Sequence, residues 1–341
     1  MMDFDQLFVT RNWVGKPVRR NEDVRFVKGE GRYVDDLDMD CAHVAILRSI
    51  FAHARIQRID ASRAAAMKGV LAVITGPEVA PQTKPIAPRA ITKPATQYVM
   101  APDKVRYVGE PIAAVVAEDR YLAEDALELI DVEYDPLQPI VRIEDALKAD
   151  APLLFEEAGS NVLLDDTLEH GDIQKAYQEA DLVLREKFQV HRYSSTPLEN
   201  WVMIARHEKA NDSFVVWAND QQPGRSVVNV CNTLKIPNNR FRLIVPDSGG
   251  GFGIKLAIWP YMVILCLLAR KVDKPVKWVQ TRREHLLAGT HAPDCHVEIE
   301  LPMKKDGTIL GLSMKDYEND GSFVHTAGIY EIGRASCRER V

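Results

Sequence analysis

The sequence predicts an α+β protein of two domains, and three observations lead to that prediction. The chain has 341 residues, which corresponds to about two domains at roughly 100–200 residues each. Short strands alternate with helices up to about residue 145, and longer β-rich segments follow residue 161. Hydrophobic residues make up 46% of the chain and charged residues 27%, as in ordinary globular proteins, which excludes wholesale disorder.

The first predicted domain covers residues 20–145. Apolar, β-branched runs predict strands at His43–Ile50, Leu71–Gly76, Pro111–Ala117 and Asp131–Leu137. Composition and periodicity predict helices at Ala61–Val70 and Arg120–Ile130. We expect this unit to pack independently of the rest, because its strands and helices alternate in a self-contained series.

The second predicted domain covers residues 155–330, after a linker at Ala146–Pro152. Four segments are β-rich: Asp181–Tyr193, Glu199–Glu208, Ser213–Asp220 and Arg240–Asp247. Helices are expected at Arg225–Leu234 and Trp259–Lys271, and a hairpin at His296–Tyr317 with its turn at Asp306-Gly307. We expect Trp259–Ala269 and an edge strand at His296–Pro302 to be partly uncovered in this chain.

Charge, cysteines and hydropathy limit the function classes. The formal net charge of −6 provides no basic face for nucleic acid. No two of the five cysteines have a CxxC spacing, so no metal site is read from this chain's thiolates. The longest apolar run, Leu256–Ala269, is too short to span a bilayer, which takes about 18–20 residues. With no export signal visible, a cytoplasmic location is expected.

The last residues do not read as natural protein. The string IGRASCRERV at residues 332–341 is the translation of a common sequencing adapter in one reading frame. We expect residues 331–341 to be an artefact and the natural sequence to be cut near Tyr330, with a natural basic tail as the alternative. Cys337 is therefore excluded from any chemistry.

A glycine-rich loop, PDSGGGFGIK at Pro246–Lys255, follows a predicted strand and precedes an apolar helix. Successive glycines let backbone N–H groups approach a ligand, and a phosphate or oxo group suits such a nest. A Walker A loop would need Gly-Lys-Ser/Thr, and a dinucleotide fingerprint starting at Gly249 would need Gly or Ala where Ile254 stands. Both nucleotide interpretations therefore fail on spacing.

The loop resembles the GGGFGxK signature of the molybdenum hydroxylases, which include xanthine dehydrogenase, aldehyde oxidase and carbon-monoxide dehydrogenase large subunits. Segments 12–37, 47–76 and 105–137 are similar, in order, to that family's N-terminal a/b hammerhead domain, and segments 276–286 and 306–312 to later parts. The resemblance implies a hammerhead domain followed by an incomplete molybdopterin-binding α+β domain.

The resemblance also implies a cofactor and the residues that bind it. The cofactor is molybdopterin with molybdenum, its cytosine dinucleotide form being one option, and its dithiolene holds the metal without a protein ligand. In the family a glutamine binds an oxo ligand of molybdenum, and Gln221 stands at the matching offset, with Gln222 the weaker alternative. Gly250, Gly251, Phe252 and Gly253 correspond to the loop beside the metal. Turn capping by Gln221 and core packing by Phe252 are the plain structural alternatives.

Other residues carry weaker signals. Glu199 lies in a segment similar to the family's PxE segment. A role in the cofactor site and a salt bridge at a strand end are equally open for it. A solvated turn is favoured for Arg282 and Arg283. Surface or packing roles are favoured for the histidines that lack metal-ligand spacing, which are His191, His285, His291 and His296.

The implied activity is hydroxylation of a small substrate, an aldehyde or N-heterocycle, with water as the oxygen source. The carboxylate general base lies beyond Tyr330 in the family, so no catalytic residue is assigned here. Iron–sulfur clusters and FAD are expected on a small and a medium partner subunit. Leu256 replaces the glutamate of purine-oxidising relatives, which puts purines in doubt. A carbon-monoxide-dehydrogenase-type large subunit, a non-catalytic protein that reuses the fold, and a nucleotide-binding enzyme are the alternatives.

Overall fold

The computed structural model describes residues 17, 19–88 and 91–323 of the chain. The predicted artefact at 331–341 and the predicted cut near Tyr330 lie outside these residues. The strands are β1 (Ala42–Arg48), β2 (Ala54–Asp60), β3 (Val70–Thr75), β4 (Lys104–Val105), β5 (Pro111–Ala117), β6 (Asp131–Pro136), β7 (Leu182–Val190), β8 (Val202–Glu208), β9 (Ser213–Ala218), β10 (Phe241–Ile244), β11 (Val276–Val279), β12 (Asp294–Met303) and β13 (Ser313–Asn319). The α-helices are α2 (Asp23–Val27), α3 (Ser62–Ala65), α4 (Gly76–Val79), α5 (Arg120–Leu127), α6 (Ile143–Ala146), α7 (Ile173–Glu179), α8 (Pro223–Leu234), α9 (Trp259–Val272) and α10 (Arg282–Ala288).

A seven-stranded mixed sheet organises the body of the molecule, in the order β10-β9-β8-β11-β1-β5-β3. It joins the two predicted domains, because β1 pairs in parallel with β11 through Ala42↔Val276 and His43↔Lys277. The expectation that residues 20–145 pack independently is therefore wrong. Strands β4, β5 and β6 nevertheless pair within that segment, since β5 lies between β1 and β3, and β2 lies between β4 and β6. The domain boundaries themselves stay a prediction.

Strand β5 shows why its sequence is apolar throughout. Successive side chains of a strand point to opposite faces. Ala114 and Val116 join the main core with α9, whereas Ala113 and Val115 join a second core with Ala126 of α5. Because both faces are covered, all seven residues of β5 are buried, and the predicted bounds Pro111–Ala117 are confirmed.

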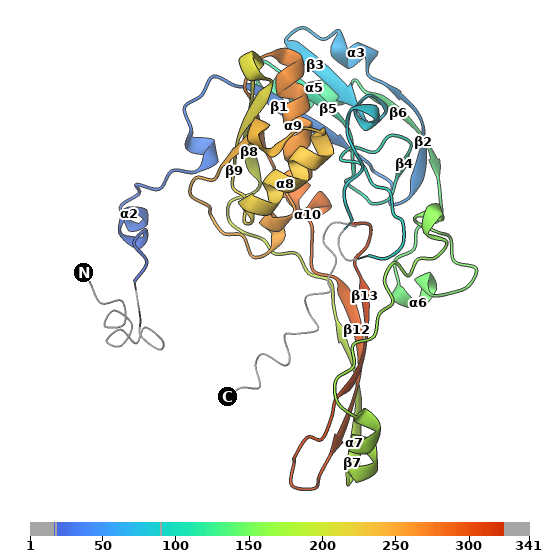
Figure 1. The fold of residues 1–341 in the computed structure, drawn as a ribbon. Coiled ribbons are helices and arrows are strands. Elements are labelled where there is room, and N and C mark those ends of the chain that lie inside the picture. Colours follow the sequence, from blue (N-terminus) through green and yellow to red (C-terminus); the bar gives the residue numbers. More distant parts are fainter. Residues whose placement is uncertain (1–16, 18, 89–90, 324–341) are drawn as a thin grey trace.

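Helix α9 lies across the main core (Figure 1), against β8, β11 and helix α8. Every residue from Trp259 to Ala269 is buried, so the expectation that this segment is partly uncovered is wrong. It is hydrophobic on all sides because sheet, α8 and surrounding loops enclose it. No helix in the described part of the chain is long and apolar enough to cross a membrane.

The second sheet, β13-β12-β7, projects from the body as a narrow stalk (Figure 1). The predicted hairpin is confirmed, with β12 and β13 paired from Asp294↔Asn319 to Glu300↔Ser313. Strand β12 also pairs with β7 along its other edge, from Cys295↔Val190 to Met303↔Leu182. The expected edge strand at His296–Pro302 is therefore central, and β7 is an edge strand of this sheet instead.

Candidate functional site

The glycine loop lies between β10 and a short 3₁₀ turn, Ile254–Leu256. Its backbone takes positive φ angles at Gly250 (+97°), Phe252 (+51°) and Gly253 (+92°). This conformation is easy for glycine and strained for other residues, so Phe252 is held in it by its surroundings. The Phe252 side chain is 72% exposed, which removes the core-packing alternative for this residue.

Gln221 lies against this loop. Its Oε1 accepts a hydrogen bond from the backbone N–H of Gly253 at 3.0 Å, and its own backbone N–H donates to the carbonyl of Lys255 at 3.2 Å. A Cβ on Gly251 would lie 2.6 Å from Gln221 Oε1, so the close approach requires glycine there. The neighbouring Gln222 makes no side-chain cap to α8.

Asp220 holds the turn that presents Gln221. The buried Asp220 carboxylate accepts hydrogen bonds from Gln222 N–H and Ser226 Oγ, both at 2.5 Å, at the start of α8. Burial raises the pKa of Asp220, partly offset by these hydrogen bonds. Such a side-chain acceptor at a helix start is a usual way to satisfy free N–H groups, and here it fixes where the chain turns after β9.

An ion pair lies under the loop. Lys255 is fully buried, and its Nζ lies 2.7 Å from Glu199 Oε2 and 3.4 Å from Ser248 Oγ. The same Glu199 oxygen accepts a hydrogen bond from the backbone N–H of Gly249 at 2.7 Å. Burial lowers the pKa of Lys255, and the interaction with Glu199 opposes that shift. The sequence left the role of Glu199 open, and it did not single out Lys255.

The segment that carries Glu199 is anchored from α10. His285 Nε2 lies 3.0 Å from Ser195 O, and Arg282 Nη2 donates to Pro197 O at 2.7 Å and Leu198 O at 3.0 Å. The interpretation of Arg282 as a solvated turn residue is therefore wrong. The capping box of Thr281 and Glu284, which starts α10, was the sequence signal that could have revealed this helix.

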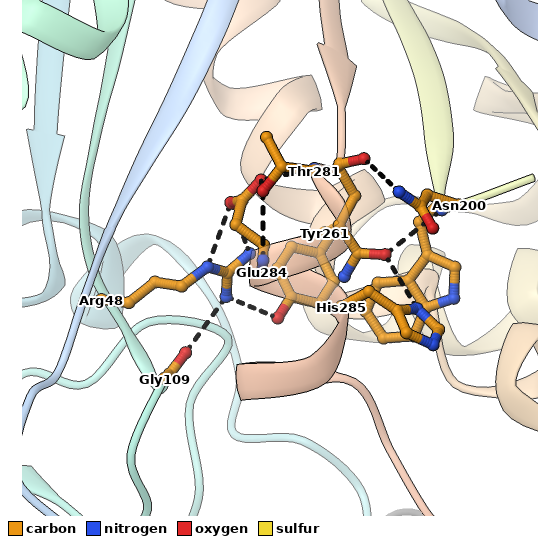
Figure 2. Close-up of polar contacts among 9 residues, drawn as sticks. Arg48, Gly109, Asn200, Tyr261, Thr281, Glu284 and His285 are labelled. Carbon is orange, nitrogen blue, oxygen red and sulfur yellow. Dashed lines mark hydrogen bonds and ion pairs between the residues drawn. The ribbon is translucent and has the colours of Figure 1, made fainter. Parts of the chain in front are cut away.

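Arg48 connects α10 to the first half of the chain (Figure 2). Its guanidinium donates to Glu284 Oε1 (3.1 Å), Tyr261 Oη (3.0 Å) and Gly109 O (3.1 Å). Arg48 is 8% exposed and comes from β1, whereas Tyr261 and Glu284 come from α9 and α10. This network joins the two predicted domains through α10, the helix that also anchors the segment carrying Glu199.

In the described part of the chain, one group of side chains has the proximity of metal ligands: Cys295, Asp316 and Glu318, on β12 and β13. Its ligand atoms lie within 4.8 Å of one another. It belongs to the projecting stalk and includes no residue of the glycine loop.

Two family models match this chain. A molybdopterin cofactor-binding domain matches residues 154–338, more than half of the chain, and an aldehyde oxidase and xanthine dehydrogenase a/b hammerhead domain matches residues 28–138. The chain belongs to the molybdenum hydroxylase large-subunit family. The α+β fold with a hammerhead domain followed by part of a molybdopterin-binding domain is confirmed. The first match extends to residue 338 and so overlaps the segment interpreted as a sequencing artefact. That interpretation of residues 331–341 stays a prediction.

Relatives within the molybdenum hydroxylases differ in what their names say they act on. The chain is 33% identical to the nicotine 6-hydroxylase large subunit of Paenarthrobacter nicotinovorans over 92% of its residues. It is 34% identical to the carbon monoxide dehydrogenase large chain of Afipia carboxidovorans over 89%. The crystal structure of quinoline 2-oxidoreductase from Pseudomonas putida 86 superposes with a TM-score of 0.76 at 34% identity, over 88% of this chain and 38% of that one. The chain spans 39% of the length of either curated relative.

The loop residues fit the cofactor that this family binds. Among the described residues, the N–H groups of Gly250, Gly251 and Phe252 have no protein acceptor, which leaves consecutive donors for an anionic or oxo group. A Cβ on Gly249 would lie 2.6 Å from the Cβ of Glu199, so only glycine lets the loop approach Glu199 this closely. Glu199 Oε1 is buried without a hydrogen-bond partner in the described part of the chain, and can accept from a ligand.

Proposed function

We propose that this chain is the molybdopterin-binding part of a molybdenum hydroxylase catalytic subunit, and that Gln221 with Gly250, Gly251, Phe252 and Gly253 binds the cofactor. The observation that carries the proposal is the hydrogen bond between Gln221 Oε1 and Gly253 N–H, because it joins two segments that the family resemblance selected separately. That contact goes beyond turn capping, since Gln221 reaches the loop and not the helix that follows it.

When bound, the cofactor supplies two-electron oxidation of a substrate carbon with water as the oxygen source. The chain's own residues bind and orient it. With Oε1 engaged by Gly253, the Nε2 group of Gln221 remains as a donor, beside the free N–H groups of Gly250 and Gly251. Preorganised donors of this kind bind negative oxygen without rearranging. The exposed Phe252 ring would shield that face from water.

The proposed substrate is an aldehyde, an N-heterocycle or a related small molecule. Leu256 follows the loop lysine and is 38% exposed, so this position offers an apolar contact and no hydrogen bond to a purine. A carbon-monoxide-dehydrogenase-type large subunit is the second candidate, because the 34% identity to that large chain is close to the 33% identity to the nicotine hydroxylase.

The proposed complex contains an iron–sulfur small subunit and an FAD-binding medium subunit, since electrons that leave molybdenum need carriers. Relatives with names such as large subunit and subunit gamma of a dehydrogenase complex support this assignment. The carboxylate general base and the second cofactor-binding lobe would come from the part of the subunit that corresponds to the remaining length of the relatives.

The test is molybdenum and pterin content in the complete catalytic subunit, produced together with both partner subunits. Gln221→Ala and Gly251→Ala should each reduce molybdenum per polypeptide by about tenfold, because each removes or displaces a donor at the cradle and a tenfold change corresponds to only about 1.4 kcal/mol. Gly251→Ala acts by pushing the Gln221 side chain off Gly253.

Two neighbouring positions provide matched controls. Gln222→Ala removes an adjacent glutamine that caps nothing with its side chain, and Gly224→Ala adds a methyl group where nothing lies within 4 Å. Both should retain molybdenum at the wild-type level. A non-catalytic protein that reuses the fold would hold no molybdenum in any variant, and equal loss in all four variants would remove the roles assigned to Gln221 and Gly251.

A further inference from the structure

The buried ion pair of Lys255 and Glu199 touches all three segments that build the proposed cofactor cradle. Lys255 is the last residue of the loop, and Glu199 lies in the segment anchored by α10. Glu199 Oε2 holds the loop's N-terminal end through Gly249 N–H. The backbone carbonyl of Lys255 holds Gln221 through its N–H. The ion pair therefore ties the two ends of the loop to each other, and the backbone of its lysine also holds the glutamine.

Stability alone is a weak explanation for such a pair. Lys255 has a side-chain exposure of 0% and Glu199 of 15%, so both charges lose most of their hydration. Replacing a buried ion pair by apolar groups is often neutral or stabilising, because desolvation offsets the attraction. The charges instead provide a specific geometry. One carboxylate oxygen of Glu199 accepts hydrogen bonds from both the Lys255 ammonium group and the Gly249 N–H, which fixes the loop against the Glu199 segment.

We propose that the Lys255–Glu199 pair is a positioning element, which sets the glycine loop and Gln221 in the relative placement that cofactor binding requires. The Lys255 ammonium group acts through Glu199, which holds Gly249, and the Lys255 side chain is assigned no contact with the cofactor. This inference rests on the proposed function for what the loop binds. The mutual placement of loop and glutamine can be measured without the cofactor.

Three variants and one control test the positioning role. Lys255→Met removes the ammonium group, Glu199→Gln removes the negative charge but keeps an acceptor, and the double variant E199Q/K255M removes both charges. Lys104→Met is the control, because the Lys104 side chain is 5% exposed and pairs with Glu156 in the first half of the chain. It removes a comparably buried lysine from an ion pair outside the cradle.

The first readout is amide hydrogen exchange at Gly249 and Gly253, measured by nuclear magnetic resonance on the cofactor-free chain. Both amides are hydrogen-bonded in the structure, to Glu199 Oε2 and Gln221 Oε1. Lys255→Met should accelerate exchange at both by more than about tenfold, since local opening exposes amides independently of global unfolding. Lys104→Met should leave these two amides unchanged even where it lowers the melting temperature.

The second readout is molybdenum content of the complete subunit with its partners. Lys255→Met should lower it at a melting temperature equal to that of Lys104→Met. Glu199→Gln should retain Gly249 protection better than Lys255→Met, and the double variant should recover stability but not molybdenum. Unchanged exchange at Gly249 and Gly253 in Lys255→Met, or equal acceleration in Lys104→Met, would overturn the positioning role. A wild-type complex without molybdenum would instead overturn the proposed function and leave the exchange result standing.

Discussion

Glu110 is a carboxylic acid in an almost dry position, 2% exposed at the turn before β5. Burial raises its pKa from its ordinary value to about 7, although hydrogen bonds from Arg106 N–H and the Gln97 side chain oppose the shift. A carboxyl group whose pKa is raised on folding binds more protons in the folded chain than in the unfolded one. Stability therefore falls as the pH rises between the ordinary pKa of glutamate and about 7.

Glu110→Gln should remove this pH dependence. The variant's free energy of unfolding should rise relative to the wild type by about 3 kcal/mol between pH 4.5 and pH 7, since one pKa unit corresponds to 1.36 kcal/mol. Burial beside Arg192 lowers the pKa of His291 to about 4, which makes stability change with pH in the opposite direction. Both proteins contain His291, so the difference between their free energies of unfolding isolates the contribution of Glu110. Urea denaturation at several pH values measures it. Glu169→Gln, at an exposed position, is the control for removing a carboxylate from the chain surface.

Among the elements, the edge strand β7 has an unusual exposed face. Four of the five residues that alternate on this face are apolar and 43–53% exposed, which are Leu182, Leu184, Phe188 and Val190, and Glu186 is the fifth. They share this face with half-buried residues of β12, since Phe188 lies opposite Val297 and Leu184 opposite Leu301. The opposite face is charged, with ion pairs such as Lys187 to Glu298. A long edge strand with a largely apolar exposed face is a typical site of self-association.

Phe188→Lys should therefore reduce self-association of this chain without changing its fold. The side chain is exposed, so the substitution should alter the free energy of unfolding by no more than about 0.5 kcal/mol. Gln189→Lys is the control, because it adds the same charge to the opposite face of the same strand. Sedimentation velocity at increasing protein concentration separates the two. Equal association by both variants would mean that net charge, and not the β7 face, controls it.

Local elements were largely predictable from sequence, and long-range pairings were not. Local patterns were enough to predict strand β5, the hairpin with its Asp306-Gly307 turn, and helix α9. Each is specified by the hydrophobic period, the length or the turn residues of its own segment. The pairing of β12 with β7 joins residues more than a hundred positions apart, and no local pattern specifies such a partner. The helix expected at Ala61–Val70 shortens to α3 because strand β3 begins at Val70.

The candidate site also has a part that the sequence predicted and a part that only the structure shows. The family resemblance selected Gln221 and the glycine loop, and the structure places these two in contact, while their roles stay proposals. Lys255 and Glu199 pair across 56 positions, so neither residue alone signalled the contact. Lysine side chains are ordinarily solvated, so the burial of Lys255 at the end of the loop could not be predicted from the sequence. It follows from the packing of the Glu199 segment against the loop.

At the scale of the whole molecule, the continuous seven-stranded sheet makes the two family domains one cooperative unit. The main core contains residues of β1, β3 and β5 as well as α8, α9 and β8, so neither half covers its apolar face alone. Residues 20–145 produced by themselves would leave these faces of β1 and β5 without α9. We therefore expect a single unfolding transition for the whole chain.

Arg48→Met tests this cooperativity, because Arg48 joins β1 to α9 and α10 from a position 8% exposed. Removing one partner of a buried pair typically costs 3–5 kcal/mol, and about 3 kcal/mol is expected here because the Glu284 side chain is 20% exposed and still caps α10. Arg58→Met, at a side chain 60% exposed on β2, should cost less than about 1 kcal/mol. Urea denaturation should be followed by tryptophan fluorescence and by hydrogen exchange of β5 in the first half. Four of the five tryptophans, Trp201, Trp217, Trp259 and Trp278, lie in the second half, and Trp13→Phe in all proteins compared restricts the fluorescence to them. Both probes should shift together in Arg48→Met. If β5 unfolds at a lower urea concentration than the tryptophans report, the two halves are separate folding units and the continuous sheet does not couple them.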